Sequence, residues 1–449
     1  MPTREDLIDD LIKPGVFDRP IDDLAARQLE AARELFAARR EQIPVVRRRA
    51  EEARIEEIGS FADLVPLLLA HTNYKSYPIA FMEQGRWDRM LQWLQTLSVL
   101  DVTEVDVEGV TDVDDWIGRL RAAGHMVQAT SGTSGKVSFL NHSQGDADLK
   151  RRHYRNISGW PFLTADNSRA VFIVGPSAGP NSAIEAYQNT AACWARPGEA
   201  HFLTDEPVLI GDISRMAALR ARMAEGTASP GEIAAAEQQA AEKGARMGWM
   251  LKTFAERLIA HRHEPINVTA QWAQHMMIID QARKMGVGDG EFHPQSMISA
   301  GGGVKGVALP TDYRQQVARF YGEVVRPGAY GMTELLSLMP RCDHMRYHRP
   351  PTLIWLLLDQ SGERLLGPDD GEAGVVEGRF GFLDLAYEGR WGGLISGDKV
   401  QIDFAPTCPC GRPGPTILDT ISRFNQSGQD DHIGCAGTID AYIRGELAA

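Results

Sequence analysis

The sequence predicts an α/β fold preceded by a largely helical segment over residues 1–115, and two patterns carry this prediction. Over residues 22–58, apolar residues recur at helical spacing among arginines and glutamates, and residues 61–100 continue in helices. From Val127 onward, short apolar runs are separated by turns that contain glycine or proline. Such runs are typical of alternating strands and helices.

Three apolar runs are the candidate strands of the α/β region: Val171–Val174, Met297–Ser299 and Leu353–Leu358. Between the first two, residues 211–262 are rich in Ala, Glu, Gln and Arg. This composition favours helix, and the Ser-Pro-Gly segment at residues 229–231 interrupts it. We therefore expect a helical hairpin between the first and second of these strands.

The length of the chain sets its domain organisation. Its 449 residues exceed the roughly 250–300 residues at which a single hydrophobic core stops growing, so two or more subdomains are expected. We expect a helical lead-in at residues 1–115 packed on a main α/β domain at 116–420. Residues 421–449 would form a short tail, too small for an ordinary compact domain.

Composition excludes several classes of partner. With 43% hydrophobic and 24% charged residues the chain is typical of globular proteins, and its net charge of -13 argues against binding nucleic acid or anionic membranes. No apolar stretch approaches the roughly 18 residues of a membrane span. The first residues do not form a signal peptide, and five cysteines do not suggest a disulfide scaffold. A cytoplasmic location is expected.

One seven-residue segment carries the strongest chemical signal. It consists of Thr130, Ser131, Gly132, Thr133, Ser134, Gly135 and Lys136. Glycines allow backbone N–H groups to converge, hydroxyls add donors, and the lysine supplies a point charge suited to a polyphosphate. The segment is not a Walker A loop, because Ser131 stands where that motif requires glycine. An ordinary surface turn is the alternative interpretation.

This loop resembles the ATP-phosphate loop of the adenylate-forming superfamily, which includes acyl-CoA synthetases and luciferases. Three later segments carry the same resemblance. Ala329–Glu334 is similar to the Tyr-Gly-x-Thr-Glu motif of that superfamily. Ser299–Gly303 stands in the place of its glycine-rich adenine-contacting turn, and Ser396–Asp398 is similar to its ribose-binding Gly-Asp pair. The segments follow the superfamily's order, and the resemblance covers about residues 35–425.

Further segments resemble one branch, the phenylacetate-CoA ligases and LuxE-type acyl-protein synthetases. They are Gly301–Gly306, Tyr347–Pro351 and Cys408–Arg412. The resemblance implies the large N-terminal domain of an adenylate-forming enzyme, with mixed sheets flanked by helices, and little or no C-terminal domain.

The resemblance also implies an activity. An ATP-dependent ligase of this kind converts a small carboxylic acid into an acyl- or aryl-adenylate, releases pyrophosphate, and passes the acyl group to a thiol or an amine. Glu334 would bind Mg²⁺, Thr333 would reach the α-phosphate, and Asp398 would bind the ribose hydroxyls. Tyr330 would flank the adenine. The remaining nucleotide-site residues would be Gly301, Gly302, Gly303, Gly331 and Arg423.

Relatives carry a catalytic lysine in a mobile C-terminal domain, whereas no lysine follows Lys399 in this sequence. Either Lys136 or Lys305 would take over its electrostatic task, or the protein would adenylate slowly, or a partner would supply the missing cation. Two alternatives therefore stay open. One is a nucleotide-binding subunit that depends on a partner, and the other is a ligase for a non-carboxylate substrate such as nitrite.

The acyl acceptor has three candidates among thiols: CoA, a carrier protein, or a cysteine of the chain itself. Cys435 lies among small residues that would leave its sulfur accessible. A thiolate is the nucleophile that such a transfer requires. The alternative is that a small side chain at this position serves packing.

A second set of residues predicts a metal site. Cys342, His348, Cys408 and Cys410 offer three sulfurs and one nitrogen, which is enough for a closed tetrahedral zinc site, and His344 is the substitute fourth ligand. About sixty residues separate Cys342 and His348 from Cys408 and Cys410, so Zn²⁺ would crosslink two segments that are far apart in the sequence. Reduced, buried thiols are the alternative.

Overall fold

The computed structural model describes residues 3–130, 136–301 and 309–424. The chain is divided into two compact units. Unit 1 comprises Met1–Ile157 and Ala329–Ala449, and unit 2 comprises Ser158–Gly328. The expected boundaries at residues 115 and 420 do not coincide with this division, because the segment between them contributes to both units.

Unit 1 opens with helices, as the spacing of apolar residues predicts. Its helices are α1 (Arg4–Leu11), α2 (Leu24–Gln42), α3 (Pro44–Ala53), η1 (Phe61–Leu67), η2 (His71–Lys75), α4 (Ile79–Glu83), α5 (Trp87–Gln95), α6 (Val113–Ala122) and α7 (Gln144–Ile157). Pro44 separates α2 from α3, since proline lacks the N–H that would continue α2 yet suits the first turn of α3. The Asp112 side chain caps α6 by accepting from the N–H groups of Asp114 and Asp115.

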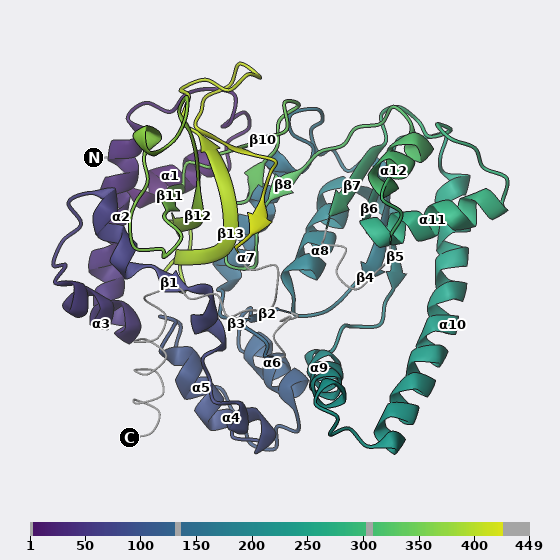
Figure 1. Ribbon diagram of the computed structural model, residues 1–449, viewed down its shortest axis with the longest axis horizontal. Helices are drawn as coiled ribbons and strands as arrows, with labels where there is room; N and C mark the ends of the chain where they lie inside the picture. The colour runs from purple at the N-terminus through teal and green to yellow at the C-terminus, as the bar shows by residue number, and fades with distance from the viewer. Residues whose placement is uncertain (1–2, 131–135, 302–308, 425–449) are drawn as a thin grey trace. The chain divides into compact units, whose positions relative to one another are not determined.

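Within the described residues, the main sheet of unit 1 has seven strands. Figure 1 labels β1, β10, β11, β12 and β13 among them. Its strands are β1 (Leu69–Ala70), β10 (Arg346–His348), β11 (Leu353–Leu358), β12 (Val375–Asp384), β13 (Gly393–Asp403), β14 (Thr416–Leu418) and β15 (Ser422–Arg423). The order β10-β14-β13-β12-β11 is antiparallel throughout, while β15 pairs antiparallel and β1 parallel with β13. Two small pairs, β2 (Gln128–Ala129) with β3 (Phe139–Leu140) and β8 (Ala329–Tyr330) with β9 (Met339–Pro340), lie outside it.

Unit 2 contains a four-stranded parallel sheet in the order β5-β4-β6-β7. Its elements are β4 (Arg169–Pro176), α8 (Ser182–Trp194), β5 (Ala195–Thr204), α9 (Ile210–Ala224), α10 (Pro230–Ala260), β6 (Ile266–Gln271), α11 (Trp272–Lys284), β7 (Met297–Gly301) and α12 (Tyr313–Tyr321). Phe172, Val268 and Ile298 lie in one buried core with residues of α10 and α11. Strands buried on both faces explain why β4 is almost continuously apolar.

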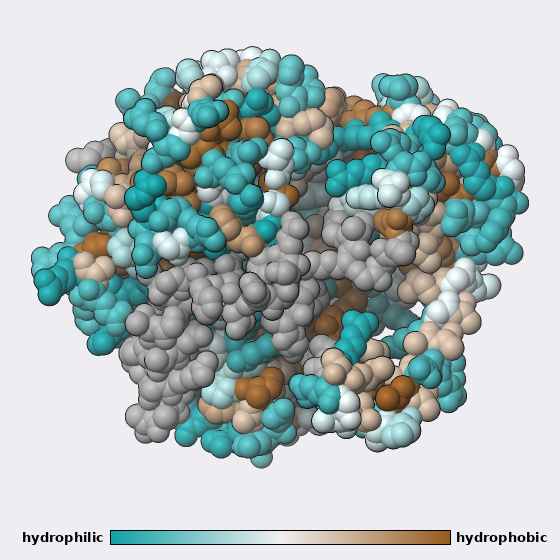
Figure 2. All heavy atoms as spheres, viewed as in Figure 1, coloured by the Kyte–Doolittle hydropathy of each residue, from teal (hydrophilic) through white to brown (hydrophobic). Residues whose placement is uncertain are grey.

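The predicted secondary structure is confirmed in both units. The three candidate strands correspond to β4, β7 and β11, and the predicted helical hairpin corresponds to α9 and α10. A capping box between Ser229 and Glu232 begins α10 at the expected interruption. Among the residues that the structure describes, no helix is long and apolar enough to cross a membrane. On the face drawn in Figure 2, most of the described surface is hydrophilic.

Candidate functional site

Three residues predicted for the nucleotide site meet on the main sheet of unit 1. Asp398 lies within β13, and Arg423 is its direct cross-strand partner on β15. The Tyr330 hydroxyl donates to Asp398 Oδ2 at 2.8 Å, and Arg423 Nε lies 3.3 Å from Asp398 Oδ1. The sheet therefore brings together segments that lie far apart in the sequence, and both carboxylate oxygens of Asp398 have a partner.

The Tyr330 hydroxyl and the Asp398 carboxylate have complementary roles in this contact. Burial raises the pKa of the Tyr330 hydroxyl well above its ordinary value, and the neighbouring Asp398 charge adds to the shift, so Tyr330 is a hydrogen-bond donor at neutral pH. Asp398 keeps acceptor capacity, because a carboxylate offers about four lone-pair sites and each oxygen has one of these two partners.

Glu334 lies in the segment between β8 and β9, where its backbone is held by a buried arginine. Arg390 donates to the Glu334 carbonyl oxygen at 2.6 Å and to the Tyr74 hydroxyl at 2.8 Å. Its guanidinium also lies 3.8 Å from the Tyr387 ring centroid. Burial raises the pKa of the Glu334 carboxyl, and the Arg390 charge opposes this shift. A cation bound at Glu334 would favour its ionised form.

The chain immediately after Glu334 is held by a buried carboxylate on β12. Asp384 accepts from the N–H groups of Leu336 and Ser337, each at 2.9 Å, and from the Ser337 hydroxyl at 2.8 Å. Sequence reasoning missed both Asp384 and Arg390 as positioning residues. The sequence feature that points to Asp384 is its position directly after the apolar run of residues 380–383. A carboxylate buried beside such a run requires several hydrogen-bond donors.

The predicted phosphate loop connects β2 to β3, and its two ends are described. The Thr130 N–H donates to the Ser138 carbonyl at 3.0 Å, and the Ser138 N–H donates to Thr130 Oγ1 at 3.2 Å. Lys136 Nζ donates to the Tyr77 carbonyl oxygen and lies 4.4 Å from the centroid of the Tyr77 ring. The lysine is therefore held on unit 1 at the end of the loop.

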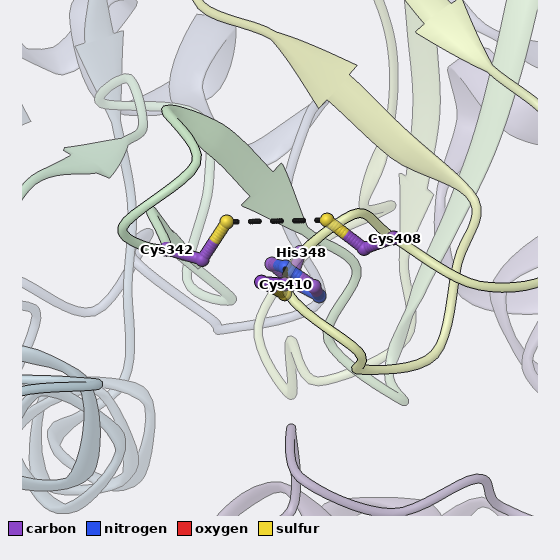
Figure 3. Close-up of side chains that lie close together, drawn as sticks. All are labelled: Cys342, His348, Cys408 and Cys410. Atoms are coloured by element: carbon purple, nitrogen blue, oxygen red, sulfur yellow. Dashed lines mark hydrogen bonds between the residues drawn. The ribbon is translucent and has the colours of Figure 1, made fainter.

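The four predicted zinc ligands form one cluster in unit 1 (Figure 3). Their ligand atoms all lie within 4.8 Å of one another. Cys342 Sγ lies 4.0 Å from Cys408 Sγ, and Cys410 Sγ lies 3.6 Å from His348 Nε2. Around tetrahedral zinc with bonds of about 2.3 Å to sulfur, neighbouring sulfurs are about 3.8 Å apart, so the donor set fits that ion.

Sheet pairing explains why these ligands converge. Cys342 lies before β10 and His348 is the last residue of that strand, whereas Cys408 and Cys410 lie in the connection from β13 to β14. Strand β10 pairs with β14. Gly411, at a φ of 81°, allows the turn in which the Cys408 N–H donates to Arg412 O at 2.8 Å.

The protonation of the cluster also bears on metal binding. Burial lowers the pKa of His348 to about 4, which leaves its imidazole in the neutral form that binds metals. Burial raises the pKa of the Cys408 thiol to about 12, a value that a bound metal would lower. His344 is exposed and does not belong to the cluster, so His348 is the fourth ligand that the structure supports.

No protein-family model matches the chain, and no curated protein matches it in sequence. Among solved structures, 2-hydroxyisobutyryl-CoA ligase in the postadenylation state with 2-HIB-AMP aligns with a TM-score of 0.51 at 13% identity, covering 92% of this chain and 71% of that chain. This is the fold of an adenylate-forming ligase. The same ligase with 2-HIB-AMP and CoA in the thioesterification state aligns with a TM-score of 0.49 at 14% identity.

The adenylate-forming fold confirms the predicted fold class. The superfamily and the branch that the sequence suggested stay predictions. The other predicted residues fall in three places. Thr333 and Gly331 lie in the segment that follows β8, where a side chain at Gly331 would overlap Leu338. Gly301 ends β7 in unit 2. Outside the described residues lie Ser131, Gly132, Thr133, Ser134, Gly135, Gly302, Gly303, Lys305 and Cys435.

Proposed function

We propose that this chain is an ATP-dependent ligase that activates a carboxylic acid as an acyl- or aryl-adenylate. The observation that supports this most directly is the contact of Tyr330 and Arg423 with Asp398, in a chain with the adenylate-forming ligase fold. Three residues singled out by their motifs lie together although the sequence separates them. Glu334 lies four residues after Tyr330, in the same segment.

Asp398 would bind the nucleotide through its ribose. The carboxylate would accept hydrogen bonds from the two ribose hydroxyls with the lone pairs that Tyr330 and Arg423 leave available. The Tyr330 ring would flank the adenine, while its hydroxyl keeps Asp398 oriented.

In the reaction, a carboxylate oxygen of the substrate attacks the α-phosphorus of ATP, and the bond from that phosphorus to the bridging oxygen breaks. Pyrophosphate leaves with the bonding electron pair. Two anions must approach each other, so donors and cations around the phosphates lower the barrier. Thr333 would contact the α-phosphate. The Thr130–Lys136 loop would bind the β- and γ-phosphates.

Glu334 suits Mg²⁺, because hard cations prefer carboxylate oxygens and keep several waters. The bound ion would offset phosphate charge. Burial raises the pKa of the Glu334 carboxyl, and a bound cation would favour its ionised form. Arg390 and Asp384 would act as positioning residues, since both hold the backbone beside Glu334.

Lys136 is our candidate for the cation that relatives place in a C-terminal domain. Its ammonium group lies at the end of the predicted phosphate loop, against the Tyr77 carbonyl and ring. A modest rotation of its flexible stem would direct it toward a phosphate. Lys305 is the second candidate.

The second half-reaction would transfer the acyl group from AMP to a nucleophile. The thiolate or amine would attack the acyl carbon, AMP would leave, and the acceptor's proton would pass to solvent. A thiol acceptor is supported by the fold that the chain shares with 2-hydroxyisobutyryl-CoA ligase, since CoA is a thiol. Carrier proteins, Cys435 and amines are the other acceptors to be tested.

The Cys342, His348, Cys408 and Cys410 cluster would hold a structural Zn²⁺. A complete set of four protein ligands leaves no open coordination position for substrate. The ion would join the β10 region to the connection between β13 and β14, close in sequence to Asp398 but not part of its contacts.

The deciding experiment incubates the purified chain with ATP, Mg²⁺ and a pooled library of carboxylic acids, followed by mass spectrometry of small molecules and intact protein. An acyl-AMP or an acyl group on Cys435 would support the proposal and identify substrate and acceptor. ATP binding without any adduct would favour a partner-dependent subunit or a non-carboxylate substrate. Asp398→Ala serves as the matched negative control.

A further inference from the structure

A cavity of about 220 Å³ lies in unit 1, apart from the Tyr330–Asp398 contact. Residues of α2, η1, β11 and the end of β13 line it. Its walls are mostly apolar, with Phe61, Leu356, Leu365, Leu366, Ile402 and Phe404 among them. None of the residues proposed for ATP or zinc lines this cavity, so it needs an explanation of its own.

Arg349 gives this apolar cavity a positive charge. Its guanidinium carbon lies 6.0 Å from the Trp355 ring centroid, and both side chains line the cavity. Within the described part of the chain, no carboxylate pairs with Arg349. A guanidinium is protonated at every physiological pH, and a partly buried cation with no carboxylate beside it attracts an anion. The arginine therefore favours an anion in the cavity.

Two further polar atoms of the lining have no partner among the residues described. The Trp355 Nε1–H and the Gln28 Oε1 are both buried and unsatisfied. The Gln28 side chain is fixed in orientation, because its Nε2 donates to the carbonyl oxygens of Pro351 at 2.9 Å and Leu353 at 3.2 Å. Since buried polar groups are almost always hydrogen-bonded, the cavity lacks an acceptor for the indole and a donor for the amide.

We propose that this cavity binds a small amphiphilic carboxylate. Its carboxylate would accept from the Arg349 guanidinium and the Trp355 N–H, and its apolar chain would lie along Leu366 and Phe404. Gln28 Oε1 would accept from a hydroxyl or a water beside the head group.

The chemistry of the lining selects this class of ligand. The planar guanidinium fork matches a carboxylate, and a single cation suits a monoanion better than a phosphate dianion. A volume of 220 Å³ is below the roughly 300–1,000 Å³ of pockets for drug-sized ligands, so the apolar chain should be short. The site is separate from the proposed adenylation chemistry and does not depend on it.

Octanoate, added without ATP, is a suitable probe, and the indole N–H resonances of the tryptophans report where it binds. The Trp355→Phe variant identifies one resonance by its loss. We expect octanoate to shift that resonance in the unaltered chain, and Arg349→Met to weaken binding about 10- to 100-fold, as expected for a hydrogen bond to a charged group. Octan-1-ol, with the same chain and no charge, should bind correspondingly less tightly.

Asp398→Ala provides the matched control for binding at the proposed active site. The shift of the Trp355 resonance should persist in that variant, whatever happens to adenylation. If Arg349→Met fails to fold, calorimetry with Trp355→Phe replaces it, and several-fold weaker binding is expected. The proposal is overturned if octanoate at millimolar concentration leaves the Trp355 resonance in place, or if the folded Arg349→Met variant binds octanoate as tightly as the unaltered chain.

Discussion

The Tyr330 hydroxyl donates a hydrogen bond to Asp398 at 2.8 Å, although 68 residues separate the two in sequence. Tyr330 belongs to the short strand β8, and Asp398 belongs to the main sheet of unit 1. Each carboxylate oxygen of Asp398 has one partner, Tyr330 or Arg423, and a carboxylate has lone pairs to accept further hydrogen bonds from a ligand. It joins two motifs that sequence similarity alone assigned to the same nucleotide.

Replacing Asp398 with alanine should raise the KM for ATP about 10- to 100-fold, because two hydrogen bonds from ribose to a charged group are lost. Pyrophosphate exchange at varied ATP concentration measures this change. Asp403→Asn is a matched control on the same strand, since that carboxylate pairs with Arg346 at 2.7 Å, outside the Tyr330 contact. An unchanged KM in Asp398→Ala would remove the ribose assignment.

Glu334→Gln should lower the rate of pyrophosphate release at least about 100-fold, because the amide cannot replace a carboxylate as a ligand for Mg²⁺. The measurement is pyrophosphate release against Mg²⁺ concentration, with folding followed by circular dichroism. Normal activity in a folded variant would contradict the metal assignment.

The same variant has a second, pH-dependent consequence without metal. Burial raises the pKa of Glu334, so the folded state holds its proton more tightly than the unfolded state does. The contribution of this proton to the free energy of unfolding is present at low pH, and it is lost as the pH rises through the pKa of Glu334 in the folded state. Glu334→Gln should therefore match the unaltered chain at low pH and be more stable at neutral pH. Thermal unfolding across this range, in EDTA, tests the sign.

Asp384→Ala should destabilise unit 1 by about 3 kcal/mol or more, because it leaves the buried N–H groups of Leu336 and Ser337 without an acceptor. Urea unfolding measures the loss. Asp384→Asn keeps one acceptor oxygen and should cost less. Equal losses in both variants would indicate that charge, rather than hydrogen bonding, holds the segment after Glu334.

The purified chain should contain about one zinc ion, and its removal by a chelator should lower the melting temperature. The reason is that the four ligands join the β10 region to the connection between β13 and β14. Elemental analysis by mass spectrometry gives the stoichiometry. Cys408→Ser should lose the metal. Cys193→Ser, at a buried cysteine outside the cluster, should retain it. Metal-free protein with unchanged stability would refute the structural zinc.

Local patterns in the sequence were sufficient to predict the α/β class, the strands β4, β7 and β11, and the hairpin of α9 and α10. These predictions succeed because hydrophobic periodicity, and the preference of Ser-Pro-Gly for a helix start, are determined by residues close together in sequence. Ligand chemistry likewise singled out Cys342, His348, Cys408 and Cys410, since few residue types bind zinc.

Only the tertiary structure decided which distant groups meet. The pairing of β15 with β13 places Arg423 beside Asp398, and β12 carries Asp384 to the segment after Glu334. The division into two units and the cavity around Arg349 and Trp355 likewise depend on sheet register and on packing. A single sequence does not contain this information locally, because strand partners are chosen by the hydrophobic burial and hydrogen bonding of the whole sheet.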